Sequence, residues 1–227
     1  MTNPILQFDV PPYRLSGTVY GTLLNSVASL AALGDAANAA PYKAAPKAPV
    51  LYVKPRNTLA VDGDRVAVPQ AAGQLQVGAA LGLVIGRTAC RVSEADALSY
   101  LAGYTAVIDY SIPHDSFYRP SVRFKALDGS CVIGPSVAPA NRIPGPDNLL
   151  INVYVDGTLA QSASSGGMVR KAARLLADVT EFMTLAPGDI LLLGVPAGSP
   201  NAKAGQTVAV EIEGVGRLEN VLVKEEA

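Results

Sequence analysis

Short aliphatic runs separated by glycine, proline and aspartate dominate the hydrophobic pattern of this chain. Runs of this kind, up to about eight residues long and closed by such breakers, are typical of buried β-strands. The pattern predicts strands over residues 50–54, 79–85, 131–133, 149–155, 190–193 and 208–212. Most of the regular structure should therefore be strand.

Two short turn sequences connect neighbouring runs. Asp156-Gly157 follows one run and suits a tight hairpin, while residues 213–216 (Glu-Gly-Val-Gly) separate two others. Glycine is favoured in such turns because it adopts positive φ angles at little cost. We expect mixed sheets that contain antiparallel hairpins.

Three segments carry a helical pattern. Over residues 167–184 an apolar stripe predicts an amphipathic helix that covers a sheet. The stripe consists of Met168, Ala172, Leu175, Leu176, Val179, Phe182 and Met183. A second helix should begin at Ser93, which suits an N-cap, and end near Gly103. A third, over residues 25–40, is interrupted by Gly34, which weakens a helix by about 1 kcal/mol relative to alanine.

Length and composition favour one globular unit. The chain has 227 residues, of which 49% are hydrophobic and 16% charged, enough for one sizeable core. We expect an N-terminal extension, residues 1–16, followed by a single domain over residues 17–227. The predicted fold class is α+β, mainly β.

The charge pattern argues against some partners. The formal net charge is -1, and lysine and arginine are scattered along the chain. Such a chain has no field that would attract nucleic acid or an anionic membrane surface. The expected partner is a small molecule or another subunit.

The cysteines and the first residues suggest a compartment. Cys90 and Cys131 are the only cysteines, and no second thiol or histidine stands at metal-ligand spacing, so we expect reduced thiols in the core and no zinc site. The first twelve residues show neither a basic start nor an apolar run of signal length. A soluble, cytoplasmic protein is the expectation.

Six short motifs occur along the chain in a characteristic order. They are Leu81–Gly86, the segment 103–109 (Gly-Tyr-Thr-Ala-Val-Ile-Asp), 125–128 (Lys-Ala-Leu-Asp), 133–135 (Ile-Gly-Pro), 187–189 (Pro-Gly-Asp) and 194–198 (Gly-Val-Pro-Ala-Gly). A lone Pro-Gly-Asp would mean only a turn. Together, over about residues 17 to 223, the motifs resemble the fumarylacetoacetate hydrolase family.

Further segments narrow this resemblance. Residues 41–47, 54–58 and 115–121 are similar to the first half, or first subunit, of family enzymes of 4-hydroxyphenylacetate (homoprotocatechuate) breakdown. The resemblance implies a mixed β-sheet roll or sandwich with a few covering helices. It also implies that residues 36–49 approach the active site. Such enzymes occur as two fused halves or as two separate chains.

The resemblance implies a metal site of three carboxylates that hold Mg²⁺. Here Gly78 and Ala80 stand where the family has glutamates, and only Asp109 matches a ligand. Mg²⁺ gives up its water reluctantly and needs several protein oxygens. We therefore expect weak metal binding or none. Without the resemblance, Asp109 would be interpreted as a strand-end residue satisfied by turn amides.

Two lysines match family positions, and Lys125 and Asp109 are the candidate catalytic residues. Lys125 is expected to face the pocket, where an ammonium group can neutralise a substrate carboxylate or stabilise an enolate. The alternative is a solvated surface lysine. Lys54 either contacts ligand or extends from its strand end into water.

Tyr118, Arg119 and Gln161 are candidate substrate-binding residues. An arginine fork suits a dicarboxylate or tricarboxylate, although Arg119 precedes a proline and can also anchor its loop. Gln161 either bonds substrate or satisfies nearby backbone. Val195 replaces a family threonine, so a hydroxyl is lost from that turn. His114 is the only histidine, and a solvated loop position is favoured over a catalytic one.

Three functions follow from the resemblance. The first is isomerisation of 2-hydroxyhepta-2,4-diene-1,7-dioate and decarboxylation of 5-oxopent-3-ene-1,2,5-tricarboxylate, with isomerisation favoured because it needs only proton transfer. The second is a structural or regulatory subunit, deficient in the metal site, that pairs with a catalytic sibling. The third is hydrolysis of a carbon-carbon bond in an acylpyruvate-like substrate. A homodimer and a heteromer with a metal-binding sibling both stay open.

Overall fold

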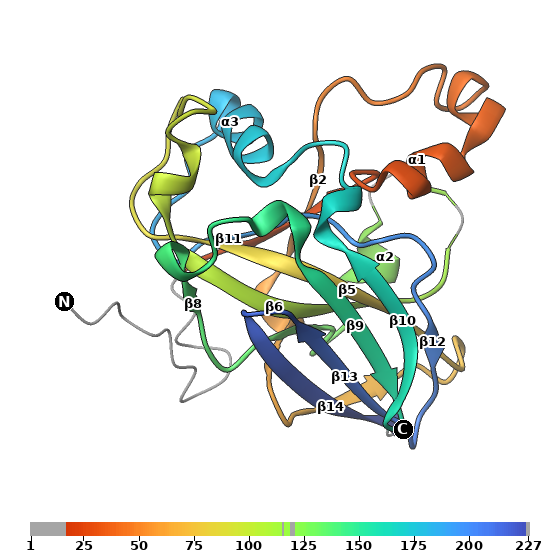
Figure 1. The fold of residues 1–227 in the computed structure, drawn as a ribbon. Helices are drawn as coiled ribbons and strands as arrows, with labels where there is room; N and C mark the ends of the chain where they lie inside the picture. Colours follow the sequence, from red (N-terminus) through yellow and green to blue (C-terminus); the bar gives the residue numbers. More distant parts are fainter. Residues whose placement is uncertain (1–16, 115, 119–120, 226–227) are drawn as a thin grey trace.

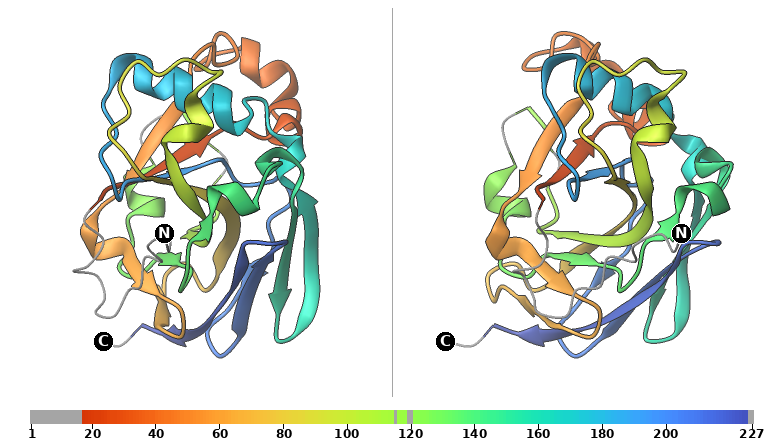
Figure 2. Two further views of the ribbon diagram at one scale, coloured as in Figure 1. Left: turned by 60° about the vertical axis from the view of Figure 1, so that its left-hand side comes forward. Right: turned by 90° about the vertical axis from the view of Figure 1, so that its left-hand side faces the viewer.

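The computed structural model describes residues 17–114, 116–118 and 121–225, and their strands form two curled sheets (Figures 1 and 2). The larger sheet consists of β1 (Val19–Leu23), β2 (Val50–Lys54), β3 (Leu59–Val61), β5 (Leu75–Ile85), β6 (Leu101–Ser111), β7 (Cys131–Ile133), β8 (Ala138–Pro139), β11 (Ile190–Leu192) and β12 (Asn201–Ala202). The smaller sheet consists of β4 (Arg65–Val68), β9 (Leu150–Val155), β10 (Thr158–Ser164), β13 (Thr207–Ile212) and β14 (Gly216–Lys224).

Both sheets are mixed. The larger follows the order β2-β1-β11-β5-β6-β7-β3, with β12 beside β5 and β8 beside β6, and its β1–β11 and β3–β7 pairs are parallel. The smaller follows β10-β9-β13-β14-β4, with a parallel β14–β4 pair. The remaining pairs are antiparallel. The predicted mainly β fold with mixed sheets is confirmed.

Three α-helices and several 3-10 turns lie outside these sheets in the described ranges. The helices are α1 (Val27–Ala32), α2 (Val122–Lys125) and α3 (Ala172–Phe182). The 3-10 turns are Gly34–Asn38, Arg56–Thr58, Ala97–Tyr100, Ala140–Arg142, Pro146–Asn148 and Ser165–Gly167. None of these helices is both long and apolar enough to cross a bilayer.

One hydrophobic core is shared by the two sheets. Val77, Ala79 and Leu81 of β5 contribute to it from the larger sheet. Val210 and Leu218 contribute from β13 and β14 of the smaller sheet. Leu175, Leu176 and Val179 of α3 join the same core. This helix therefore covers one end of the larger sheet, at the upper left of Figure 1. A second, smaller cluster lies on the other face of the larger sheet and includes Ala80 and Val107.

The predicted strands are confirmed, with small differences at their ends. Both hairpins are also confirmed. Asp156 and Gly157 connect β9 to β10 with φ angles of 51° and 75°, and Gly214, with φ of 71°, lies in the turn between β13 and β14. These positive φ values are the backbone conformations that the two turn sequences predicted.

The helix predictions were less accurate. Between Ser93 and Gly103 the structure forms only the 3-10 turn Ala97–Tyr100, because residues from Leu101 onward pair with β5 as part of β6. The Ser93 hydroxyl oxygen nevertheless accepts a hydrogen bond from the backbone N–H of Asp96, as a capping side chain would. The helix expected over residues 25–40 stops at α1 and resumes as a 3-10 turn at Gly34, whose φ is +49°.

Two predicted core positions are wrong. Phe182, on the last turn of α3, is 64% exposed. The helix itself begins at Ala172 rather than near Gly167. Cys131 is a buried free thiol, whose pKa burial raises to about 12, but Cys90 is exposed. Cys90 faces outward because the adjacent Ala89 takes the inward position and bonds Leu185 through its backbone. The predicted N-terminal extension, residues 1–16, lies outside the described residues.

Candidate active site

Strand pairing places the three family ligand positions on one face of the larger sheet. Gly78 of β5 is the direct cross-strand partner of Asp109 of β6, and Ala80 is the partner of Val107. Directly opposed residues in an antiparallel pair share a face of the sheet. Positions 78, 80 and 109 therefore lie where a three-carboxylate site would need them, although only Asp109 supplies a carboxylate.

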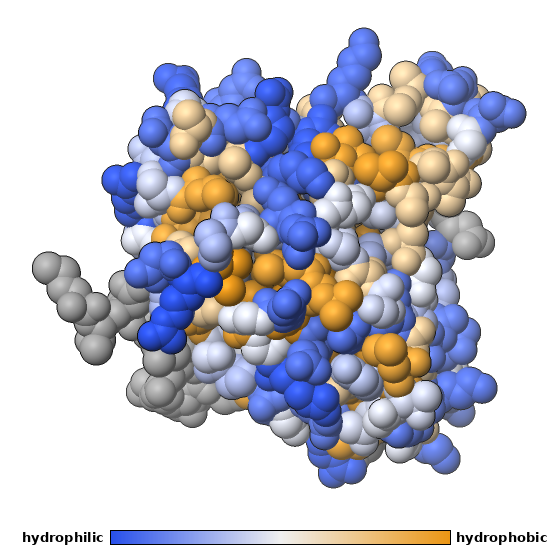
Figure 3. Space-filling view, in the orientation of Figure 1, coloured by the Kyte–Doolittle hydropathy of each residue, from blue (hydrophilic) through white to orange (hydrophobic). Residues whose placement is uncertain are grey.

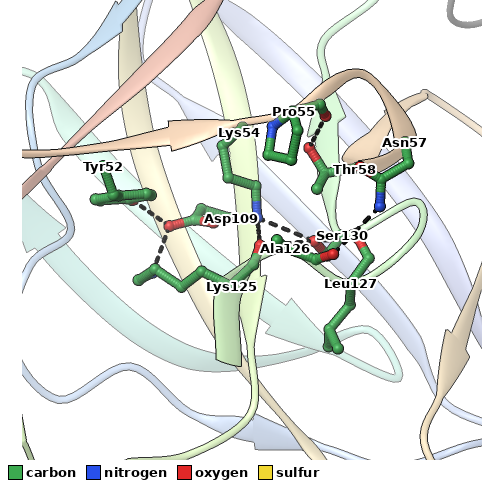
Figure 4. A network of polar contacts seen from close by, with 10 residues as sticks. All are labelled: Tyr52, Lys54, Pro55, Asn57, Thr58, Asp109, Lys125, Ala126, Leu127 and Ser130. Atoms are coloured by element: carbon green, nitrogen blue, oxygen red, sulfur yellow. Dashed lines mark hydrogen bonds and ion pairs between the residues drawn. The ribbon is translucent and has the colours of Figure 1, made fainter. Parts of the chain in front are cut away.

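Asp109 is fully buried and has three partners, which come from β2 and α2 (Figure 4). The Lys125 Nζ at the end of α2 lies 2.7 Å from Oδ2, and the Lys54 Nζ at the end of β2 lies 2.9 Å from Oδ1. The Tyr52 hydroxyl, also from β2, donates to Oδ2. The carboxylate is therefore held by ion pairs and a phenol rather than by turn amides, so the strand-end interpretation of Asp109 is wrong.

The electrostatics of this cluster keep Asp109 ionised. Burial raises the pKa of the Asp109 carboxyl, but the ammonium groups of Lys125 and Lys54 outweigh burial and hold that pKa well below its usual range. Burial and the neighbouring Asp109 charge raise the pKa of Tyr52 well above its usual value, so the phenol stays protonated. Two ammonium groups face one carboxylate, which leaves the cluster with an excess positive charge.

Lys54 has a structural role. Its Nζ donates to the Lys125 carbonyl oxygen at 2.5 Å and to the Ser130 Oγ at 2.9 Å, in addition to its ion pair with Asp109. Its side chain is 0% exposed, and it does not line the cavity described next. Lys54 thus neither extends into water nor reaches a ligand there. It joins the end of α2 to Ser130, the residue just before β7.

Lys125 connects the cluster to a cavity of about 260 Å³. Asp109, Tyr52 and His114 also line this cavity, as does the segment Val195–Ser199. The side chain of Lys125 is only 9% exposed, so it is not a solvated surface lysine. Its Nζ also stands 4.6 Å from the centre of the Tyr52 ring, a cation-π distance. Lys125 is thus the cluster's ammonium group that a small ligand can reach.

A second cavity, of about 540 Å³ and mainly apolar, lies beside the first. Tyr52, Phe117 and Lys125 line both cavities. Tyr118 lines the second cavity, is 54% exposed and packs edge-on against Tyr42. Tyr118 therefore lies near Lys125 but in the apolar cavity, while Arg119 lies outside the described residues.

Gln161 stabilises a turn that lines the cavity. Its Nε2 donates to the Ala197 carbonyl oxygen at 2.8 Å, and Gln161 is not among the residues that line the 260 Å³ cavity. The bond holds the turn that contains Val195 and Gly198. Of the two interpretations of Gln161, this placement favours satisfying nearby backbone.

His114 is not a solvated loop residue. Its ring is half-buried, stacks on Phe124 with centroids 4.7 Å apart, and meets Phe117 edge-on. It also lines the 260 Å³ cavity. The solvated position that its loop context favoured is therefore wrong.

The side chains present do not fit a divalent cation. The single carboxylate is already bound by two ammonium groups and a phenol, which are not metal ligands. A β-carbon added at Gly78 would lie 2.7 Å from the Asp109 carbonyl oxygen and 3.0 Å from a Val195 methyl group, so no larger residue enters there without movement. Within the described ranges, no three His, Cys, Asp or Glu residues gather in a way that could hold a metal.

Tyr52 is the site residue that sequence reasoning missed. It stands two residues before Lys54 in β2, and residues at this spacing share a face of a strand. Once Lys54 had been matched to the family, this spacing was a signal that the Tyr52 side chain points to the same site. The ring also fills the space above Gly21, where a β-carbon would lie 1.9 Å from it.

Comparison with known proteins defines the class of this chain. A family profile described as "Fumarylacetoacetate (FAA) hydrolase C-terminal" matches residues 18–223. The chain belongs to the fumarylacetoacetate hydrolase family.

Particular relatives are enzymes. The chain is 41% identical, over 93% of its length, to the 4-hydroxyphenylacetate degradation bifunctional isomerase/decarboxylase of Escherichia coli, and covers 48% of that protein. It thus spans about half the length of this relative. It is 33% identical to the mitochondrial oxaloacetate tautomerase fahd-1 of Caenorhabditis elegans, covering 73% of this chain and 79% of the relative.

A solved structure has the same fold. The 5-carboxymethyl-2-hydroxymuconate delta-isomerase of Mycobacterium smegmatis superposes with a TM-score of 0.79 at 26% identity, over 99% of this chain and 82% of that one.

Proposed function

We propose that this chain is an isomerase that moves a proton within a small unsaturated keto-dicarboxylate, with 2-hydroxyhepta-2,4-diene-1,7-dioate as the intended substrate. The observation that carries the proposal is the buried cluster in which two ammonium groups share one carboxylate while Lys125 opens to a small cavity. A buried site with excess positive charge is stabilised by an anionic ligand. A substrate carboxylate or enolate oxygen supplies that charge.

The chemistry of isomerisation suits this site. The enol O–H proton leaves, the electron pair moves through the conjugated diene, and a proton returns to carbon at the far end. Negative charge collects on the enolate oxygen during this transfer, and the fixed Lys125 ammonium stabilises it. Decarboxylation of 5-oxopent-3-ene-1,2,5-tricarboxylate depends more heavily on an electron sink, so we rank it second.

The relatives support a reaction of this kind. The Escherichia coli protein is named as an isomerase as well as a decarboxylase, and the Caenorhabditis elegans protein is named as a tautomerase. Isomerisation of a dienol and tautomerisation of a keto acid both proceed by proton transfer next to a carbonyl. Their common step requires an anion-stabilising group and a base, and does not require bond cleavage between carbons.

A second candidate is a subunit that pairs with a catalytic sibling. The chain covers 48% of the Escherichia coli relative, and Gly78 and Ala80 replace the expected glutamates. A sibling that carries the glutamate pair would then perform the metal-dependent chemistry. In that case this chain would contribute an interface.

The test uses the purified full chain. Isomerase and decarboxylase activities are measured with Mg²⁺ and with EDTA, and Mg²⁺ binding is measured by calorimetry. We expect isomerisation that EDTA does not reduce, and no heat of Mg²⁺ binding. Turnover that requires Mg²⁺ would contradict the proposal. Turnover that appears only after a sibling chain is added would favour the second candidate.

Variants then assign the activity to the site. K125M should lower kcat/KM about 100-fold, the usual cost of losing one group that stabilises developing charge. The matched control is K203M, because Lys203 is an exposed lysine away from the cavity. Equal activities of the two variants would show that Lys125 does not act in turnover.

A further inference from the structure

The cavity beside Lys125 contains an imidazole that the function proposed above has not used. His114 lines this cavity together with Asp109, Lys125 and Tyr52. It follows the end of β6, two residues after Ile112 and five residues after Asp109. A neutral imidazole is the side chain best suited to accept a proton near neutral pH.

Local packing fixes the ring of His114. Its plane lies nearly parallel to that of Phe124, at an angle of 8° and a centroid distance of 4.7 Å, and Phe117 packs against it at 5.4 Å. The Nδ1 atom lies 2.8 Å from the carbonyl oxygen of Ile112. Two aromatic contacts and a hydrogen bond thus restrain both the position and the rotation of the ring.

The hydrogen bond also assigns the protons of the neutral ring. A carbonyl oxygen can only accept, so Nδ1 carries the hydrogen and Nε2 carries the free lone pair. Nε2 is shielded from bulk solvent and has no hydrogen-bond partner in the described part of the chain. A restrained imidazole with an unpartnered lone pair can take a proton from a ligand whose binding brings its O–H group to Nε2.

The other ionisable groups of the cavity cannot serve as this base. Asp109 is bound by two ammonium groups and the Tyr52 hydroxyl, and its pKa lies well below the usual range. Tyr52 donates a hydrogen bond to Asp109, keeps its proton and stays a neutral phenol. Lys125 is an ammonium group ion-paired with Asp109. The remaining polar side chains in the wall are hydroxyls and an amide, on Thr22, Ser29, Gln76, Ser111 and Ser199.

We propose that His114 is the proton-transferring catalytic residue of this site and that it acts on a 2-hydroxy-dienoate bound with its enolate oxygen toward Lys125. Nε2 takes the enol O–H proton, so an O–H bond breaks and an N–H bond forms while the electron pair moves into the diene. The N–H bond then breaks as a C–H bond forms at the far end of the conjugated system. The substrate is isomerised, and no oxidant, reductant or co-reactant is consumed.

This inference rests on the isomerase proposal, and H114N tests it most directly. Asparagine can still donate a hydrogen bond to the Ile112 carbonyl but has no atom equivalent to Nε2. We expect kcat to fall by about 100-fold or more, the usual contribution of a general base. KM should stay within about threefold, and added imidazole should restore part of the rate. The control is S162A, an exposed serine of β10 that does not line the cavity, which should keep the wild-type rate.

Because the chain has a single histidine, NMR gives a second readout that does not depend on turnover or on a variant that folds. The imidazole nitrogens of the wild-type protein labelled with ¹⁵N-histidine should shift when heptanedioate, a saturated dicarboxylate of the same length, fills the cavity. Unshifted signals under saturating heptanedioate would overturn the role of His114, even if H114N did not fold.

The outcomes separate the two proposals. A wild-type chain that isomerises the dienoate, combined with an H114N variant of equal kcat, overturns the role of His114 and leaves the isomerase proposal standing. A wild-type chain without isomerase activity overturns both. Loss of activity in H114N together with rescue by imidazole supports both.

Discussion

At the scale of single residues, Asp109 shows how a buried charge is kept at a tolerable cost. A carboxylate removed from water is strongly destabilised unless charges and hydrogen bonds replace its hydration. Lys54 and Lys125 supply the charges at 2.9 Å and 2.7 Å, and Tyr52 supplies a neutral donor. These partners come from β2, far from β6 in the sequence, and from α2, which follows β6 after a loop, so the site also ties three elements together.

The Tyr52 hydroxyl should contribute measurably to stability. In Y52F the ring remains above Gly21 and near Lys125, and only the bond to Asp109 is lost. A hydrogen bond to a charged group contributes about 2 kcal/mol, so the free energy of unfolding should fall by about that amount. Urea denaturation measures this. Y154F is the matched control, because the Tyr154 hydroxyl has only an exposed contact of 3.5 Å to Glu211.

Acid should weaken the fold through Asp109. The pKa of this carboxyl is held below its usual value in the folded protein, mainly by Lys125 and then by Lys54, against the effect of burial. The ionised form therefore favours folding above the unfolded-state pKa of about 3.9, and that contribution is lost as the pH falls further. The difference between wild type and Y52F should persist at pH 4, where Asp109 stays ionised in the folded protein, and should shrink only as the pH falls toward the much lower folded-state pKa, because a protonated Asp109 is a weaker acceptor. An unchanged difference in urea titrations at low pH would contradict this assignment.

At the scale of elements, the two faces of the β5–β6 pair have different roles. One face packs into the shared core, and the other carries the candidate site. Residues of β5 such as Val77 and Ala79 enter the shared core, while Gly78 and Ala80 face the Asp109 side. Val195 from the turn after β11 lies against Gly78 and takes up space there. The pairing thus places the site, and the small residues on β5 allow the turn to approach.

Gly78 should resist even a single added carbon. In G78A the new methyl group would meet the Asp109 carbonyl oxygen at 2.7 Å, so the two central strands or Val195 must move. Overpacking of this kind costs about 2 kcal/mol of unfolding free energy. G145A is the control, because a β-carbon at Gly145 meets nothing within 4 Å and its φ of -129° suits alanine. Equal stabilities of the two variants would mean that the site relaxes easily.

Helix α1 is attached only weakly to the rest of the molecule. It buries none of its residues, and Val27 is 55% exposed. Apolar side chains are visible over this part of the surface at the upper right of Figure 3, where Figure 1 places α1. Ser29 and Ala32 nevertheless line the cavity. A helix without buried side chains has little packing energy to prevent local opening.

Hydrogen exchange should reveal this weakness. Amides of α1 should exchange far faster than those of β5 and β6, because local opening there exposes no core. Saturating heptanedioate should slow exchange in α1, since a ligand in the cavity contacts the face that carries Ser29 and Ala32. The measurement is mass spectrometry of exchanged peptides. Exchange in α1 that does not respond to a ligand bound with measurable heat would contradict the expected contact.

At the scale of the whole molecule, the two sheets share one core and should unfold together. Residues of β5, β13 and α3 lie in one hydrophobic cluster, so neither sheet can lose its partner without exposing apolar surface. We expect a single cooperative transition. Far-UV circular dichroism should coincide with tyrosine fluorescence, which is usable because the chain has no tryptophan and places tyrosines in both sheets. Two separate transitions would contradict the expectation of one domain over residues 17–227.

The sequence by itself determined the mainly β class, the position of most strands, both hairpins and the family. These features depend on local hydrophobic runs, on glycines at positive φ and on the order of motifs, all of which can be read along the chain. It also indicated that Asp109 and Lys125 would belong to the site, through the resemblance. The helix expected from Ser93 failed because pairing of Leu101 with β5 outweighed a local capping signal.

Only the tertiary structure decided what the site contains. It showed that Lys54 makes buried hydrogen bonds to other protein groups and that Gln161 stabilises a turn. It also showed that the Tyr52 hydroxyl donates a hydrogen bond to Asp109. The sequence predicted a solvent-exposed loop position for His114. In the structure its ring packs against two phenylalanines and lines the cavity. The contacts of Lys54, Gln161 and Tyr52 join residues remote in sequence, and the energies of all these contacts come from burial and geometry, which no local pattern along a chain encodes.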